Sequence, residues 1–85
     1  MSQKIYVGNL PNNIGNEVLT EKFSKYGHVC SAKIIKDSET NLSMGFGFVE
    51  MESPEEAEKA IINLNGSIFN GRSISVVEAK KSLLH

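Results

Sequence analysis

Three aromatic side chains in two short segments with β-strand character are the residues of this sequence that could do chemistry. Tyr6 lies within residues 4–10, and Phe46 and Phe48 lie within residues 44–51. Side chains alternate between the two faces of a strand, so Phe46 and Phe48 share a face. Exposed rings with glycines between them suit the stacking of flat, unpaired nucleobases, at roughly 1–3 kcal/mol per base. The chemistry would be recognition by stacking.

The face of residues 44–51 that points inward decides whether these rings are exposed. If Val49 and Met51 face the core, Phe46 and Phe48 stand outside. The alternative buries both phenylalanines and leaves the glycine face in water. Burial is the commoner fate of phenylalanine when this segment is taken alone.

Residues 4–10 favour the first arrangement. Ile5 and Val7 form the better core face, and Tyr6 and Gly8 then point outward. If the two segments are neighbours in one sheet, Tyr6 joins the two phenylalanines. We therefore expect an aromatic platform on one face of a sheet.

The two segments resemble the two sequence signatures of the RNA recognition motif family. Residues 5–10 are similar to its six-residue signature, and residues 44–51 to its eight-residue signature. The resemblance extends from about residue 4 to about residue 79. Two positions depart from the pattern: Met44 stands where a lysine or arginine is typical, and Met51 where an aromatic residue is typical.

The resemblance implies a single-stranded RNA binder in which Tyr6 and Phe48 each stack one base. Phe46 would then pack between riboses, where contact with the 2′-hydroxyl helps to distinguish RNA from DNA. The backbone near residues 78 and 79 would contact base edges, and lysine and arginine side chains would contact phosphates or bases. The candidate RNA-binding residues are Lys4, Tyr6, Lys33, Ile35, Lys36, Met44, Phe46, Phe48, Arg72, Glu78, Ala79 and Lys80.

The elements that must position these residues follow the order β, α, β, β, α, β. Helices are predicted over residues 16–26 and from residue 54 to about 64, and further strands over residues 29–36 and up to 79. This order predicts an α+β, ferredoxin-like sandwich, in which a four-stranded antiparallel sheet carries both helices on one face. In the resembling family the first and third strands are central, which would place Tyr6 beside the two phenylalanines.

Local signals support individual elements. Ser53 and Glu56 form a capping box for the second helix. Asn70 and Gly71 predict a two-residue hairpin turn after Phe69, which we expect in the core. A bulge near Ser31 could change which face Lys33 and Ile35 occupy; we expect both on the platform side.

Length and composition indicate one soluble domain. We expect residues 1–85 to form a single domain with a core over about 4–79 and a tail over 80–85. The chain has 40% hydrophobic and 22% charged residues, and no apolar run approaches the roughly 20 residues that span a bilayer. We expect a monomer in the cytosol, or in the nucleus of a nucleated cell. Its brevity and its start at Met1 make it similar to the stand-alone bacterial members of the family.

Catalytic and metal-dependent functions have little support. Cys30 is the one cysteine, which excludes an intramolecular disulfide and a thiolate metal site. Residues 9–15 lack the basic residue and glycine cluster of an anion-binding loop. The Gly45 and Gly47 pair lacks the third glycine of a dinucleotide-binding motif. We therefore expect no enzyme activity, no metal and no cofactor.

The charge leaves a second function open. The net charge is −1 and the pI about 6.1, so the chain offers no global attraction to phosphates. The predicted helices hold several glutamates while lysines lie in or beside strands, so the sheet side would be the more basic one. A shallow salt dependence follows, at about −0.7 in the log-log slope per neutralised phosphate. The alternative is a protein-interaction module that binds a peptide or partner protein on the same aromatic face.

The sequence also leaves open the roles of two segments and the biological role of the chain. Residues 37–43 are either a mobile loop that folds over bound RNA or a solvated connection. Lys80 and Lys81 could touch phosphates, or Leu83 and Leu84 could fold back over the rings. The expected role is post-transcriptional regulation or RNA chaperoning, with single-stranded DNA bound more weakly than RNA.

Overall fold

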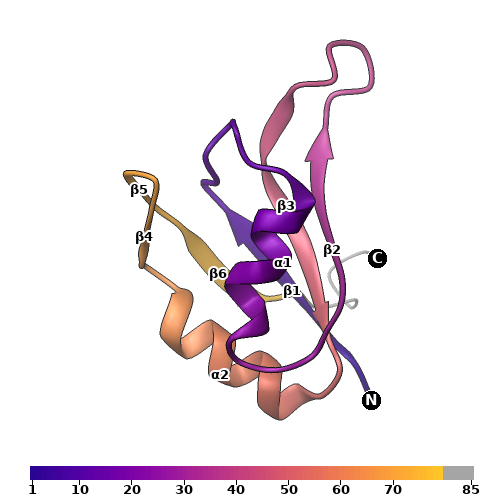
Figure 1. Ribbon diagram of the computed structural model, residues 1–85, viewed down its shortest axis with the longest axis vertical. Coiled ribbons are helices and arrows are strands. Elements are labelled where there is room, and N and C mark those ends of the chain that lie inside the picture. Colours follow the sequence, from indigo (N-terminus) through magenta and orange to yellow (C-terminus); the bar gives the residue numbers. More distant parts are fainter. Residues whose placement is uncertain (80–85) are drawn as a thin grey trace.

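The computed structural model of the protein describes residues 1–79 and has the predicted order of elements, with a short two-stranded hairpin added before the last strand (Figure 1). Four strands form one antiparallel sheet in the order β2-β3-β1-β6, so β1 and β3 are central. This confirms the predicted α+β, ferredoxin-like arrangement. The elements are β1 (Gln3–Gly8), α1 (Asn16–Ser24), β2 (Val29–Lys36), β3 (Ser43–Met51), α2 (Pro54–Leu64), β4 (Ile68–Phe69), β5 (Arg72–Ser73) and β6 (Ser75–Glu78).

Both helices cover one face of the sheet, and no helix formed by residues 1–79 lies on the other face (Figure 1). The core lies between sheet and helices. Strand residues Ile5, Val7, Val49 and Met51 are fully buried there, as expected from alternation. The helices contribute Leu19, Phe23, Ala57, Ala60 and Leu64. Burial of the aliphatic face settles the alternative left by the sequence: Phe46 and Phe48 are not in the core cluster.

Helix α1 begins after Gly15 and ends at Ser24, two residues before the predicted end. The backbone N–H of Tyr26 donates to the carbonyl oxygen of Phe23 at 3.0 Å, a tighter i to i−3 bond that closes the last turn. Tyr26 is partly buried against the core.

The start of helix α2 differs from the predicted capping box. The Ser53 hydroxyl oxygen accepts a hydrogen bond from the backbone N–H of Glu56 at 3.2 Å, which is half of the motif. The Glu56 carboxylate accepts instead from the backbone N–H of His28 at 3.3 Å. The side chain therefore joins α2 to the segment before β2.

The β4–β5 hairpin turns at Asn70 and Gly71, as predicted, with φ of +50° and +84°. Positive φ at both central residues defines the type I′ turn that suits a two-residue hairpin. Phe69 is 8% exposed and belongs to the core, and the Lys22 amine lies 4.6 Å from the centroid of its ring.

The predicted bulge near Ser31 is present as a register shift between β2 and β3. It does not move Lys33 to the other face, because Lys33 pairs with Phe48. Paired residues of antiparallel strands have side chains on the same side. Lys33 therefore lies on the open face, as expected.

Candidate functional site

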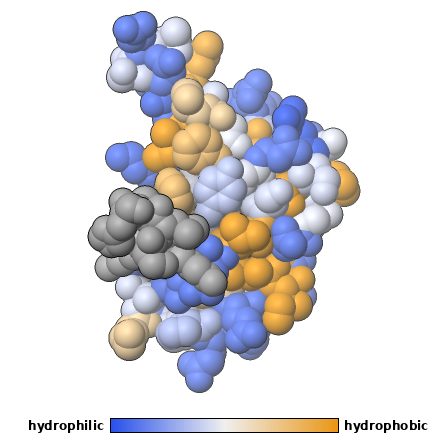
Figure 2. Space-filling view, turned by 180° about the vertical axis from the view of Figure 1, so that it is seen from behind, coloured by the Kyte–Doolittle hydropathy of each residue, from blue (hydrophilic) through white to orange (hydrophobic). Residues whose placement is uncertain are grey.

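Tyr6, Phe46 and Phe48 form a cluster on the open face of the sheet, which we call the aromatic platform. Tyr6 lies directly opposite Phe48, and Phe46 lies opposite Gly8. The ring centroid of Tyr6 is 5.8 Å from that of Phe46 and 5.9 Å from that of Phe48, and the two phenylalanine centroids are 6.2 Å apart. Each of the three residues is partly exposed. The open face seen in Figure 2 accordingly carries hydrophobic surface among polar side chains.

The three rings are not parallel. Tyr6 and Phe46 are tilted by 31°, whereas Phe46 and Phe48 are perpendicular. Such edge contacts hold aromatic side chains in place without hiding all of their faces. The platform thus offers ring surfaces at different angles, which suits separate planar groups better than one large flat ligand.

Neighbouring strands extend the platform on both sides. Lys33 on β2 pairs with Phe48, and Val77 on β6 pairs with Tyr6. Ile35, two residues beyond Lys33, is partly exposed. Val77 is 45% exposed and was missed as a site residue. Alternation would have found it: if the aliphatic Val76 faces the core, its neighbour on the strand must face outward.

Both signs of charge lie beside Phe48. The Lys4 amine lies 5.8 Å from the centroid of the Phe48 ring, within the range of a cation–π contact. Lys4 is paired with Glu50 across β1 and β3, so both face the same side as the platform. The Glu50 carboxylate also accepts a hydrogen bond from the Ser2 hydroxyl.

Arg72 lies on the β4–β5 hairpin rather than on the four-stranded sheet. One terminal guanidinium nitrogen (Nη2) donates to Oδ1 of Asn9 at 2.6 Å, and Nε donates to the Asn9 carbonyl oxygen at 3.3 Å. Nδ2 of Asn9 donates in turn to the carbonyl oxygen of Ser73 at 2.8 Å. Asn9 follows β1 directly, so these bonds tie Arg72 to the end of β1 near Phe46.

Met44 and Lys36 lie beyond an irregularity in the β2–β3 pair. Around Gly45, three residues of β3 lie opposite one residue of β2, and the φ of Gly45 is +86°. The strict alternation that grouped Met44 with Phe46 is therefore interrupted. Met44 is 54% exposed and Lys36 is exposed, both near the far end of the hairpin.

The other candidate positions lie on or beyond β6. Glu78 pairs with Ile5, so its side chain points to the helix side and away from the platform. The backbone N–H of Ala79 donates to the carbonyl oxygen of Lys4 at 3.0 Å, which holds Ala79 beside the platform. Lys80 lies outside the described residues, as does the rest of the predicted tail.

The loop between β2 and β3 is organised by Asp37. Its Oδ1 accepts hydrogen bonds from the backbone N–H groups of Glu39 at 2.7 Å and Thr40 at 3.1 Å. These two bonds hold the pKa of the Asp37 carboxyl below its ordinary value of 3.8, since they stabilise the carboxylate. The backbone N–H of Asp37 donates to the carbonyl oxygen of Leu42 at 2.9 Å. The loop therefore has a defined turn at its base.

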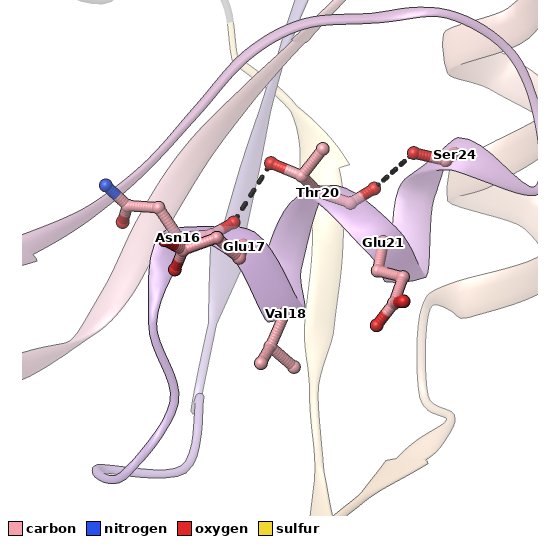
Figure 3. A pocket seen from close by; sticks show the side chains of 6 residues that line it. All are labelled: Asn16, Glu17, Val18, Thr20, Glu21 and Ser24. Atoms are coloured by element: carbon pink, nitrogen blue, oxygen red, sulfur yellow. Dashed lines mark hydrogen bonds between the residues drawn. The ribbon is translucent and has the colours of Figure 1, made fainter.

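A depression lies on the surface of α1 (Figure 3). The Thr20 hydroxyl donates to the carbonyl oxygen of Asn16 at 2.9 Å, and the Ser24 hydroxyl donates to that of Thr20 at 2.6 Å. These hydroxyls are bonded within the helix, and one helix supplies the whole lining, so the depression is a weaker candidate than the platform. Its lining residues are Asn16, Glu17, Val18, Thr20, Glu21 and Ser24.

Residues 1–79 hold no cluster of three or more histidine, cysteine, aspartate or glutamate side chains that could bind a metal ion. In the same part of the chain, no helix has the length and apolar character to cross a membrane.

The sequence of this chain matches one known protein family and several characterised proteins over most of its length. Residues 5–75 match the family model for the RNA recognition motif. The chain is 48% identical over 75 residues to a 31 kDa chloroplastic ribonucleoprotein of Nicotiana sylvestris, a match covering 88% of this chain and 24% of that protein. It is 42% identical over 80 residues to a 28 kDa chloroplastic ribonucleoprotein of Spinacia oleracea, covering 94% and 34%. The chain thus spans about a quarter to a third of the relatives it matches.

Solved structures agree with the fold. The crystal structure of the RNA binding protein PG1 superposes with a TM-score of 0.90 at 47% identity, over 93% of this chain and 95% of that chain. The second RRM domain of the yeast poly(U)-binding protein Pub1 superposes with a TM-score of 0.85 at 30% identity, with the same coverage.

Proposed function

This chain belongs to the RNA recognition motif family, and on that premise we propose that it binds single-stranded RNA on the open face of its sheet. The observation that carries the proposal is the aromatic platform. The ring centroids of Tyr6, Phe46 and Phe48 lie within 6.2 Å of one another, on the face of the sheet opposite α1 and α2. Three partly exposed rings gathered on one face of the sheet form a surface on which bases can stack.

Stacking supplies the sequence-independent part of the binding. Tyr6 and Phe48 each stack one base, at roughly 1–3 kcal/mol per base. Phe46 packs against ribose, and contacts with the 2′-hydroxyl make RNA a better ligand than single-stranded DNA. The tilted arrangement of the rings supports this division, because bases of a splayed single strand need not be coplanar.

Cations around the platform supply the contacts to phosphates. Lys4 and Lys33 flank Phe48 on neighbouring strands, and Lys36 lies near the far end of the hairpin. A guanidinium has five N–H donors, and two of those of Arg72 bond to Asn9. On the opposite side, the helices carry Glu17, Glu21, Glu55, Glu56 and Glu58. This distribution supports an approach of RNA from the sheet side despite the net charge of −1.

A protein-interaction module is the second candidate. Exposed Met44 and Val77 add apolar surface, and Glu50 adds a negative charge to the platform side. Apolar and aromatic residues suit a protein interface as well as an RNA interface. If the chain has this second function, a peptide covers the same three rings.

An affinity measurement on Phe48→Ala separates ring stacking from nonspecific attraction. A short, fluorescently labelled RNA of mixed sequence is titrated with the wild type and followed by anisotropy. The substitution should weaken binding by more than about 1 kcal/mol with little change in thermal midpoint, because Phe48 is outside the core. Ile62→Ala removes an exposed apolar side chain from α2 and is the matched control.

Unchanged affinity in Phe48→Ala, or an equal loss in Ile62→Ala, would contradict the platform as the binding surface. No RNA binding by the wild type, with binding of a peptide lost in Phe48→Ala, would favour the second candidate.

We propose that the chain acts as a monomer in post-transcriptional regulation or RNA chaperoning.

A further inference from the structure

Glu50 is a carboxylate on the face proposed to bind a polyanion, and stacking does not use it. It is partly buried, lies two residues after Phe48 on the same side of β3, and is flanked by Lys4 on β1 and Ser31 on β2. Same-face neighbours on a strand are about 7 Å apart, which is close to the width of a base. A base that stacks on Phe48 is therefore large enough to reach Glu50 with one of its edges.

One hydrogen bond orients the Glu50 carboxylate. The Ser2 hydroxyl donates a hydrogen bond to one of its oxygens. Its cross-strand partner Lys4 directs its amine to the Phe48 ring, 5.8 Å from the centroid. Lys4 and Glu50 therefore lie on the same side of the sheet as Phe48.

An ionised carboxylate accepts hydrogen bonds and donates none, and it repels phosphate. Its compatible RNA groups are the donors on base edges and the ribose 2′-hydroxyl, and of these only the base-edge donors differ from base to base. Guanine presents two neighbouring N–H donors on its Watson–Crick edge, and cytosine and adenine each present an amino group. Uracil presents one N–H between two carbonyl oxygens, which a carboxylate repels.

We propose that Glu50 selects the base stacked on Phe48, favouring guanine and rejecting uracil. This inference rests on the proposed function, since it names which base one stacking position takes. The two oxygens of the Glu50 carboxylate can accept from the two neighbouring N–H donors of guanine, which gives a bidentate contact. Acidic side chains also accept hydrogen bonds from amino groups of bases in other complexes. The contact lies at a partly exposed surface, so the lower end of the usual range applies, about fivefold in affinity per base.

The test compares labelled octauridine with an octamer that has two central guanines in a uridine background. The wild type should bind the guanine octamer about fivefold tighter. Glu50→Gln has the same shape but offers an amide that can also donate to uracil carbonyl oxygens. It should bind octauridine more tightly and reduce the ratio to about twofold or less. Glu58→Gln makes the same charge change on exposed α2 and should keep the wild-type ratio.

Three results would overturn the inference while leaving RNA binding intact. The first is a wild type that binds octauridine at least as tightly as the guanine octamer. The second is a Glu50→Gln variant that keeps the wild-type ratio, and the third is a Glu58→Gln variant that loses it equally. If the wild type binds neither octamer, the proposed function fails as well, and the two failures are thereby distinguished. A thermal melt of each variant confirms that it is folded.

Discussion

The phenol ring of Tyr6 lies over Gly8, two residues further along the same strand. A methyl group built on Gly8 would come within 2.7 Å of the Tyr6 hydroxyl oxygen and 2.9 Å of ring atom Cε2. Gly8 is also the cross-strand partner of Phe46. The absence of a side chain at Gly8 therefore lets the Tyr6 ring reach toward Phe46, and this contact assembles the platform.

Replacement of Gly8 by alanine should displace the Tyr6 ring and weaken RNA binding. The obstructed atoms belong to the end of a flexible side chain, so the ring can move and the backbone need not shift. We expect affinity to fall to about that of Tyr6→Ala, with the free energy of unfolding changed by less than about 1 kcal/mol. Anisotropy titration and urea unfolding measure the two quantities.

The double variant Gly8→Ala with Tyr6→Ala is the control for that mechanism. If the methyl acts only through the ring, it should have no further effect once the ring is absent. Additive losses in the double variant would show that Gly8→Ala acts by another route.

Gly47→Ala should destabilise the fold instead. A methyl on Gly47 would lie 2.5 Å from the backbone carbonyl oxygen of Lys33 and 3.0 Å from Cα of Ile34. Backbone atoms of a paired strand cannot move aside as a side chain can, so β2 and β3 must separate locally. A loss of roughly 1–3 kcal/mol in the free energy of unfolding is expected from urea denaturation. Equal stability of Gly47→Ala and Gly8→Ala would refute this distinction.

Asp37 should titrate below its ordinary pKa of 3.8 in the folded protein, because the backbone N–H groups of Glu39 and Thr40 stabilise its charged form. A lowered pKa in the folded state favours folding above the unfolded pKa, and this contribution is lost as pH falls through the folded value. The amide proton shifts of Glu39 and Thr40, followed against pH, report the midpoint. A midpoint at or above 3.8 would show that the two hydrogen bonds do not hold the loop in solution.

Much of the fold was predictable because alternation and helical spacing are local properties. Burial of Ile5 and Val7 required Tyr6 to face outward, and the same rule placed Phe48. The turn at Asn70 and Gly71 was equally predictable, because asparagine and glycine are the residues that most readily adopt the positive φ that this turn requires at both positions.

Features that depend on tertiary contacts were not predictable in this way. The Glu56 carboxylate bonds to His28 rather than closing its own cap, since β2 begins beside α2. Arg72 bonds to Asn9, 63 residues earlier. The face of Glu78 is different: the alternation that buries Val76 and exposes Val77 also turns Glu78 to the helix side, in agreement with its pairing with Ile5. The exposure of Val77 was predictable on the same ground.

An amide chemical-shift titration with a short RNA of mixed sequence tests the central claim most directly. If RNA covers the platform, the largest shifts should fall on Tyr6, Phe46, Phe48 and the flanking Val77, and the outer surfaces of α1 and α2 should change little. Shifts concentrated on the helices, or a platform that stays silent while RNA binds, would contradict the account.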